Sequence, residues 1–183
     1  ISLYDYYISD LMNSIYFQSD NSKIISMDSF KLSFSAQYLK QTEVGDKLLG
    51  NLDTYLAGAK FGFFMGDAKL TLLYDIVGNH TIKGSGTDYS TMGYSTFVNF
   101  TYAEGLNAGA ESYGAALGYS FGNLKPSIKY IHIEQDLEKQ ATGNTSNIRP
   151  SSDEWNLDVK YKINSISKLR VRLGKLDYES THK

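Results

Sequence analysis

The most regular feature of the chain is an alternation of apolar and polar residues with a period of two. Between Ser29 and Leu39 the sequence reads S-F-K-L-S-F-S-A-Q-Y-L, so bulky apolar residues occupy every second position. Successive side chains of a β-strand point to opposite faces of its sheet, and the alternation therefore predicts a strand with one apolar and one polar face. The same pattern recurs at residues 55–63, 70–76, 113–121, 128–130, 155–163 and 169–173.

Two less regular segments near the start, Ser2 to Tyr7 and Leu11 to Gln18, complete a prediction of roughly nine strands. The segment from Thr96 to Tyr102 fits an additional strand and a structured part of a long loop equally well. The predicted fold class is therefore all-β and antiparallel, and each strand is expected to pair with the strand that follows it in the chain.

The predicted connections alternate in length along the chain. Short turns at Gly66-Asp67, Gly122 to Lys125 and Asn164 to Ser167 are interleaved with long polar loops at residues 41–51, 78–109 and 134–153. Several strands have the ~9 to 11 residues that a tilted strand needs to cross a bilayer. Short turns on one side and long loops on the other are typical of outer-membrane β-barrels. The pattern predicts a transmembrane up-and-down barrel of the porin type.

A soluble barrel or sandwich is the alternative, because its strands alternate as well, with the apolar face turned inward. The positions of the aromatic residues favour the membrane. With the short turns on the periplasmic side, aromatic residues fall at both ends of the strands, as the two interfacial girdles of a membrane barrel require. The predicted girdle residues are Tyr38, Tyr74 and Trp155 at the outer ends, and Phe63, Tyr119, Phe121 and Tyr161 at the inner ends.

The composition narrows the function further. Among 183 residues there are 15 tyrosines and no cysteine, and the formal net charge is -2. The lack of a basic excess argues against a nucleic-acid partner. Without cysteine the chain has no disulfide framework, thiolate metal site or thiol nucleophile. The three histidines, His80, His132 and His182, are too scattered to share a metal, so we expect neither metal nor cofactor.

Several segments resemble the OprD family of outer-membrane porins, the carboxylate-selective channels of Gram-negative bacteria. The resemblance covers nearly the whole chain and is carried by S-L-Y-D-Y-Y at residues 2–7, G-A-E-S-Y at 109–113, G-Y-S-F at 118–121, W-N-L-D-V at 155–159 and L-R-V-R-L at 169–173. The most specific element is the Leu-Arg-x-Arg strand that follows a short turn after an acidic strand containing Leu157-Asp158.

The resemblance implies a complete barrel of about eighteen strands, of which residues 1–183 would form the C-terminal half. The N-terminal half, with the main constriction loop of the family, and the last strand are expected to be missing. The polar segment from Lys175 to Lys183 stands where the family continues to a final strand with a terminal aromatic residue. The family also implies the outer membrane of a Gram-negative bacterium, contact with lipid and lipopolysaccharide, no enzymatic activity, and a monomer or loose trimer.

Charged residues at the polar positions of the strands are the candidate functional groups, because a channel acts through the charges that line its lumen. Their parity predicts a basic track along the pore, crowded toward the short turns: Lys31, Lys60, Lys69, Lys129, Lys160, Lys162, Lys168, Arg170 and Arg172. Asp75, Glu154 and Asp158 are the predicted lumen acids. OprD-like channels are described as guiding carboxylates along such a ladder, and guanidinium groups suit this task because they pair with carboxylates bidentately. Alternatively, these bases are solvated lumen residues or offset neighbouring acids.

The leading hypothesis is a substrate-selective, passive diffusion channel for small anionic solutes such as carboxylates or amino acids. An outer-membrane barrel enzyme, a protease or phospholipase, is a second possibility. Its local indications are His132 near Glu134, with Ser127 on a neighbouring stretch. A soluble ligand-binding β-barrel is the third.

Overall fold

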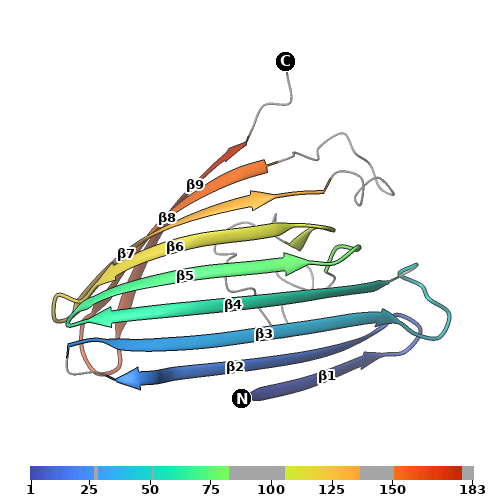
Figure 1. Ribbon diagram of the computed structural model, residues 1–183, viewed down its shortest axis with the longest axis horizontal. Coiled ribbons are helices and arrows are strands. Elements are labelled where there is room, and N and C mark those ends of the chain that lie inside the picture. The colour runs from blue at the N-terminus through green and yellow to red at the C-terminus, as the bar shows by residue number, and fades with distance from the viewer. Residues whose placement is uncertain (27–28, 51, 83–105, 137–150, 179–183) are drawn as a thin grey trace.

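The computed structural model describes residues 1–26, 29–50, 52–82, 106–136 and 151–178. They form one antiparallel sheet of nine strands in which neighbours in sequence are neighbours in space (Figure 1). The predicted all-β antiparallel barrel-type fold is confirmed. The strands are β1 (Ser2–Ile8), β2 (Met12–Ser26), β3 (Lys31–Glu43), β4 (Asp53–Met65), β5 (Ala68–Val77), β6 (Glu111–Tyr119), β7 (Leu124–Glu134), β8 (Ser151–Lys162) and β9 (Lys168–Tyr178).

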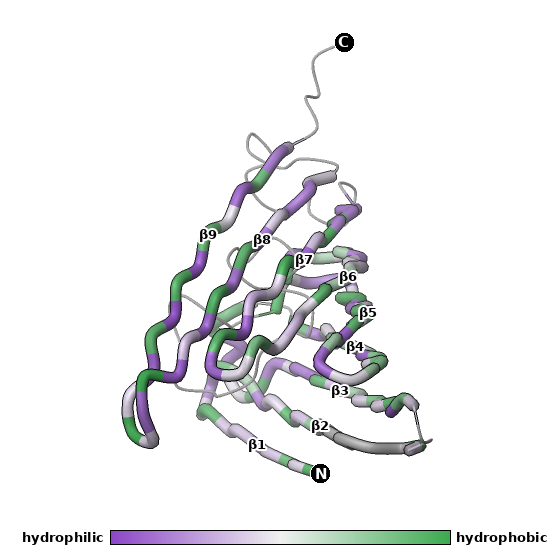
Figure 2. The backbone as a smooth tube through the Cα atoms, turned by 90° about the vertical axis from the view of Figure 1, so that its left-hand side faces the viewer, coloured by the Kyte–Doolittle hydropathy of each residue, from purple (hydrophilic) through white to green (hydrophobic). Residues whose placement is uncertain are grey.

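The sheet curls into an open trough with β1 and β9 at its two edges (Figures 1 and 2). Among the described strands these two pair on one side only, so the sheet does not close on itself. In the described part of the chain, no helix has both the length and the apolar character to cross a membrane.

The two faces of the sheet differ in a way that a soluble barrel does not. Polar side chains of one face are buried, with Gln37 3% exposed and Asp75 1% exposed. Bulky apolar side chains of the other face are open, with Phe61 48%, Leu117 58% and Trp155 47% exposed. Figure 2 shows this alternation most clearly along β8 and β9, where hydrophilic and hydrophobic positions succeed each other. Within the described residues, the Phe, Leu and Tyr rows therefore lie on the outer face of the trough and the polar rows on the inner face.

The strand bounds differ from the prediction mainly in β2 and β3. Strand β2 continues to Ser26 rather than ending near Gln18, and its register with β3 shifts between Asn21 and Ile25. The polar run from Ser19 to Ser22 interrupts the alternation of apolar and polar residues, so the pattern does not predict this part of the strand. Strand β3 runs on to Glu43, and the following loop is shorter than expected. The predicted segment from Thr96 to Tyr102 lies outside the described residues.

We call the two ends of the sheet the turn end and the loop end. At the turn end, tight connections join β4 to β5 and β6 to β7, and Gly66 and Gly122 adopt positive φ there. At the loop end, the short β1–β2 turn is tied to the β3–β4 connection. The Leu48 N–H donates to the carbonyl oxygen of Asp10 at 2.9 Å, and the Asp46 N–H donates to Asp10 Oδ1 at 3.3 Å. These two connections form one joined rim.

A small apolar core covers the inner face near the loop end. It contains both ends of the long β5–β6 connection, which pack against β2, β3 and β4. The buried members are Met12, Tyr16, Leu39, Leu52, Leu56, Val77, Ile82, Leu106 and Ala110. The Ile82 N–H donates to the Leu106 carbonyl at 3.0 Å, and Thr54 Oγ1 donates to the His80 carbonyl at 2.5 Å. The ends of this connection are therefore folded over the inner face of the sheet.

Candidate solute pathway

The register of the strands places all of the predicted basic residues on the inner face. Lys160 pairs with Arg170, Lys162 pairs with Lys168, and Arg172 pairs with the buried Asp158. Lys129 is opposite the buried Asn156, and Lys60 is opposite Ser35. Lys31 and Lys69 both pair with Phe64, on either side of β4. All of these groups can thus line one continuous surface.

Most of these bases lie toward the turn end, where β8 and β9 meet. Successive inward positions on a strand are about 7 Å apart, so the pairs Lys162–Lys168 and Lys160–Arg170 form two adjacent rungs. Lys69 experiences the like charges of Lys60 and Lys160. The two walls of the trough contribute to one positively charged region.

Asp158 is the centre of the densest charge cluster. Arg170 Nε donates to Asp158 Oδ1 at 2.9 Å and to Oδ2 at 3.0 Å, and Arg170 Nη2 also donates to Oδ2. Arg172 Nε lies 3.8 Å and Lys160 Nζ lies 3.9 Å from the same Oδ2. We call these four residues the Asp158 cluster. Parity had placed them on one face, but only the register shows that they touch.

The other two predicted lumen acids lie deeper in the wall and nearer the loop end. Gln37 Nε2 donates to Asp75 Oδ1 at 2.8 Å, and Asn156 Nδ2 donates to Glu154 Oε1 at 2.6 Å. Both carboxylates are buried, with exposures of 1% and 0%. Lys129 interacts electrostatically with both of them. Both carboxylates therefore interact with neighbouring side chains of the inner face.

A stack of tyrosines on β1 and β2 forms a further part of the inner face. The Tyr4 ring lies 6.1 Å from the Tyr16 ring and 6.2 Å from the Tyr6 ring, measured between centroids. Tyr16 Oη also donates to Gln37 Oε1 at 3.4 Å. The sequence alone does not predict this stack, because it depends on the register between two irregular strands. It lies at the opposite edge of the sheet from the Asp158 cluster.

The predicted girdle residues all project from the outer face. Their exposures range from 39% for Tyr74 to 61% for Phe121. Several make ring contacts with outer-face neighbours, including Tyr38 with Tyr55 and Trp155 with Tyr130. An amphipathic role at a membrane interface remains a prediction for each of them.

A polar belt beside these rings at the loop end was not predicted. Tyr74 Oη donates to Glu111 Oε1 at 2.9 Å, and Tyr130 Oη donates to Asp153 Oδ1 at 2.6 Å. His132 Nδ1 lies 2.8 Å from the same Asp153 oxygen. Each pair joins two strands, so the separate strand sequences carried no indication of it.

Of the residues considered for an enzyme, His132 and Glu134 lie together, with His132 Nε2 3.6 Å from Glu134 Oε1, but Ser127 does not join them. Ser127 lies on the inner face, opposite Asp158, whereas His132 lies on the outer face against Tyr113 and Asp153. Since the two side chains leave opposite sides of β7, the serine and the imidazole cannot share a substrate. His182 lies outside the described residues.

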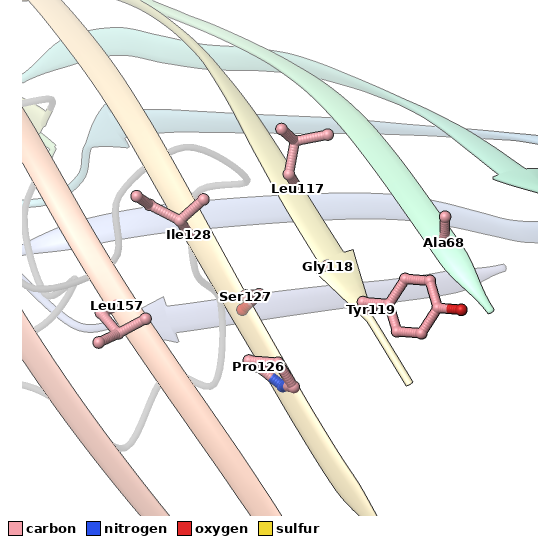
Figure 3. A pocket seen from close by; sticks show the side chains of 8 residues that line it. All are labelled: Ala68, Leu117, Gly118, Tyr119, Pro126, Ser127, Ile128 and Leu157. Carbon is pink, nitrogen blue, oxygen red and sulfur yellow. The ribbon is translucent and has the colours of Figure 1, made fainter. Parts of the chain in front are cut away.

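One shallow hollow of about 420 Å³ lies between the turn-end halves of β5 to β8 (Figure 3). It is lined mainly by apolar outer-face residues, namely Ala68, Leu117, Tyr119, Pro126, Ile128 and Leu157. The hollow is therefore separate from the charged inner face.

No family model and no curated protein sequence matches the chain. Several solved structures are similar to the chain. The outer membrane protein OprD from Pseudomonas aeruginosa superimposes with a TM-score of 0.75 at 17% identity, covering 97% of this chain and 50% of that one. OccAB3 from Acinetobacter baumannii gives a TM-score of 0.71 at 16% identity, covering 97% and 46%. OpdK from Pseudomonas aeruginosa, solved with vanillate, gives 0.71 at 17% identity, covering 97% and 46%.

These similarities define the class of fold as an outer-membrane porin barrel. More particularly, it is the fold of the OprD and Occ proteins, and the predicted resemblance to the OprD family is confirmed at the level of the fold. The chain spans about half the length of these proteins.

Proposed function

We propose that this chain forms part of a passive channel in the outer membrane of a Gram-negative bacterium, through which small anionic solutes such as carboxylates or amino acids diffuse. The observation that carries the proposal is the separation of the two faces. Open apolar rows suit contact with lipid, and the inner face concentrates lysine and arginine near the turn end. An anion inside the trough would meet this positive region.

The similar structures support the same conclusion. They include outer membrane proteins of Pseudomonas and Acinetobacter, and one of them was solved with vanillate, a small carboxylate. Nine strands among the described residues, in a chain of about half the length of such proteins, support a complete barrel of about eighteen strands. Partnership with lipid and lipopolysaccharide, as a monomer or loose trimer, follows from the same proposal.

The proposal predicts that the full-length protein conducts anions in preference to cations. Purified protein would be inserted into planar bilayers, and the reversal potential would be measured in a potassium chloride gradient. Replacing both Arg170 and Arg172 by Ser removes two positive charges from the inner face. The chloride-to-potassium permeability ratio should fall by about two- to fivefold, because lumen charge sets the local ion concentration.

The matched control removes two positive charges from the outer face. Lys40 pairs with Tyr55, and Lys175 pairs with Trp155, so both bases lie among outer-face aromatic residues. The double variant Lys40→Ser with Lys175→Ser should retain the wild-type permeability ratio. Unchanged selectivity in the arginine double variant would remove these residues from the track, and a cation-selective wild-type channel would overturn the proposed function.

A further inference from the structure

We propose that Asp158 is a positioning residue that holds Arg170 in the orientation in which the Asp158 cluster binds a carboxylate solute. This inference rests on the proposed function and assigns a specific role within it. A carboxylate in an anion pathway would ordinarily be regarded as a repulsive charge that weakens anion binding. The geometry of the Asp158 cluster points to the opposite effect on the solute.

The contacts fix the plane of the Arg170 guanidinium. Nε contacts both oxygens of Asp158, at 2.9 and 3.0 Å, and Nη2 binds Oδ2. A guanidinium is a rigid planar fork, so two of its nitrogens on one carboxylate determine the direction of the whole group. A neutral partner would form weaker hydrogen bonds and hold the fork less firmly.

Within the Asp158 cluster, the acid is buried and the three bases are exposed. The Asp158 side chain is only 6% exposed, whereas Arg170 is 40%, Arg172 is 44% and Lys160 is 55% exposed. A solute at the inner face therefore meets the cations and not the carboxylate. Three positive charges around one negative charge leave an excess of two, so the cluster remains attractive to an anion.

Fixing the arginine in advance favours binding. A long charged side chain loses rotamer freedom when it binds a solute, and a partner that orders it beforehand reduces that loss. Removing the charge of Asp158 would thus have two opposing effects. The inner face would become more positive overall, while Arg170 would lose its fixed orientation. General anion selectivity and carboxylate affinity should then change in opposite directions.

Asp158→Asn in the full-length protein tests this directly, with benzoate as the carboxylate probe. The chloride-to-potassium permeability ratio is measured in bilayers, and the apparent dissociation constant of benzoate comes from its concentration-dependent block of chloride current. We expect the permeability ratio to rise, while benzoate binds about fivefold more weakly because the fork is released. Benzoate binding at least as tight as in the wild type would overturn the inference.

Asp75→Asn is the matched charge control. Asp75 is also a buried acid of the inner face, and the neutral amide of Gln37 donates a hydrogen bond to it. Its removal should raise the permeability ratio without weakening benzoate block. Equal weakening in both variants would mean that Asp158 has no special relation to Arg170, and the inference would fail.

Arg170→Lys keeps the positive charge but cannot form the two-nitrogen contact, so it should weaken benzoate binding about as much as Asp158→Asn. Combining the two substitutions should cause no additional loss, because both remove the same contact. If Asp158→Asn does not yield a folded barrel, the benzoate affinity of Arg170→Lys tests the inference by itself. Wild-type affinity for benzoate in that variant overturns the inference. A wild-type channel without anion preference or benzoate block would instead refute the proposed function, and this inference with it.

Discussion

Gly114 and Gly118 lie on the same face of β6 but have different surroundings. A Cβ added to Gly114 would lie 2.5 Å from the Tyr130 carbonyl oxygen and 3.3 Å from the Ile131 Cα. These are backbone atoms of the paired strand and cannot move without disturbing the sheet. At Gly118 the nearest atom would be the Ser127 Cβ at 3.5 Å, an ordinary contact. The absence of a side chain is therefore required at Gly114 alone of the two.

We predict that Gly114→Ala destabilises the folded barrel by about 1–3 kcal/mol through overpacking, whereas Gly118→Ala changes its stability little. The measurement is the free energy of unfolding in a urea titration, followed by the slower gel migration of the unfolded chain. Equal stability of the two variants would contradict the backbone clash inferred for Gly114.

At the scale of strands, alternation alone predicted most of the sheet. It located β3 to β9 and assigned the predicted lumen charges to one face, because parity along a strand needs no knowledge of its neighbours. It failed in β2, where a polar run and a register shift between Asn21 and Ile25 interrupt the pattern. The errors in β2, toward the turn end, and in β3, at the loop end, arose because strands continue into segments that are polar enough to resemble loops.

Contacts between strands could not be predicted in this way. Asp158, Arg170 and Arg172 were each assigned to the inner face, but their contacts depend on the pairing of β8 with β9. The polar belt formed by Tyr130, His132 and Asp153 depends in the same way on the pairing of β7 with β8. Sequence therefore indicated which side chains share a surface, and register determined which of them touch.

The β5–β6 connection gives a prediction at this scale. Leu106 is 6% exposed within the apolar core on the inner face, where it helps to hold the end of that connection against the wall. Leu106→Asn places an amide in this core and should loosen the connection, because a buried amide without partners costs about 1–3 kcal/mol. We expect a higher or more variable single-channel conductance in planar bilayers.

Leu48→Asn is the control for this experiment, because Leu48 lies in the β3–β4 connection and is 69% exposed. Its conductance should equal that of the wild type. If the Leu106 variant also conducts like the wild type, the buried ends of the β5–β6 connection do not control the width of the path.

For the molecule as a whole, the decisive question is which solvent covers the outer face. Leu72 lies in the middle of β5 and is 42% exposed, and Ile163 follows β8 at the turn end and is 56% exposed. In a membrane, Leu72→Arg should destabilise the barrel by about 2–4 kcal/mol, and Ile163→Arg by about 0–1 kcal/mol, because the cost depends on depth.

The measurement is the free energy of unfolding of both variants in lipid vesicles, from urea titrations. In water both substitutions would be nearly neutral, since both side chains are already exposed. Equal, small effects of the two arginines in vesicles would therefore refute contact of this face with hydrocarbon.

The order of the strands also affects how such a molecule is built. Because every described strand pairs with the strand next to it in the chain, most closing steps join segments that are close in sequence. The entropy lost in the longer β5–β6 and β7–β8 steps is only moderately greater, because it grows with the logarithm of the loop length. The sheet can grow by successive hairpins, each using the edge left by the one before. During assembly the molecule would then present one growing edge at a time, opposite the fixed edge of β1, and this growing edge is the surface that a folding helper or a neighbouring strand would need to recognise.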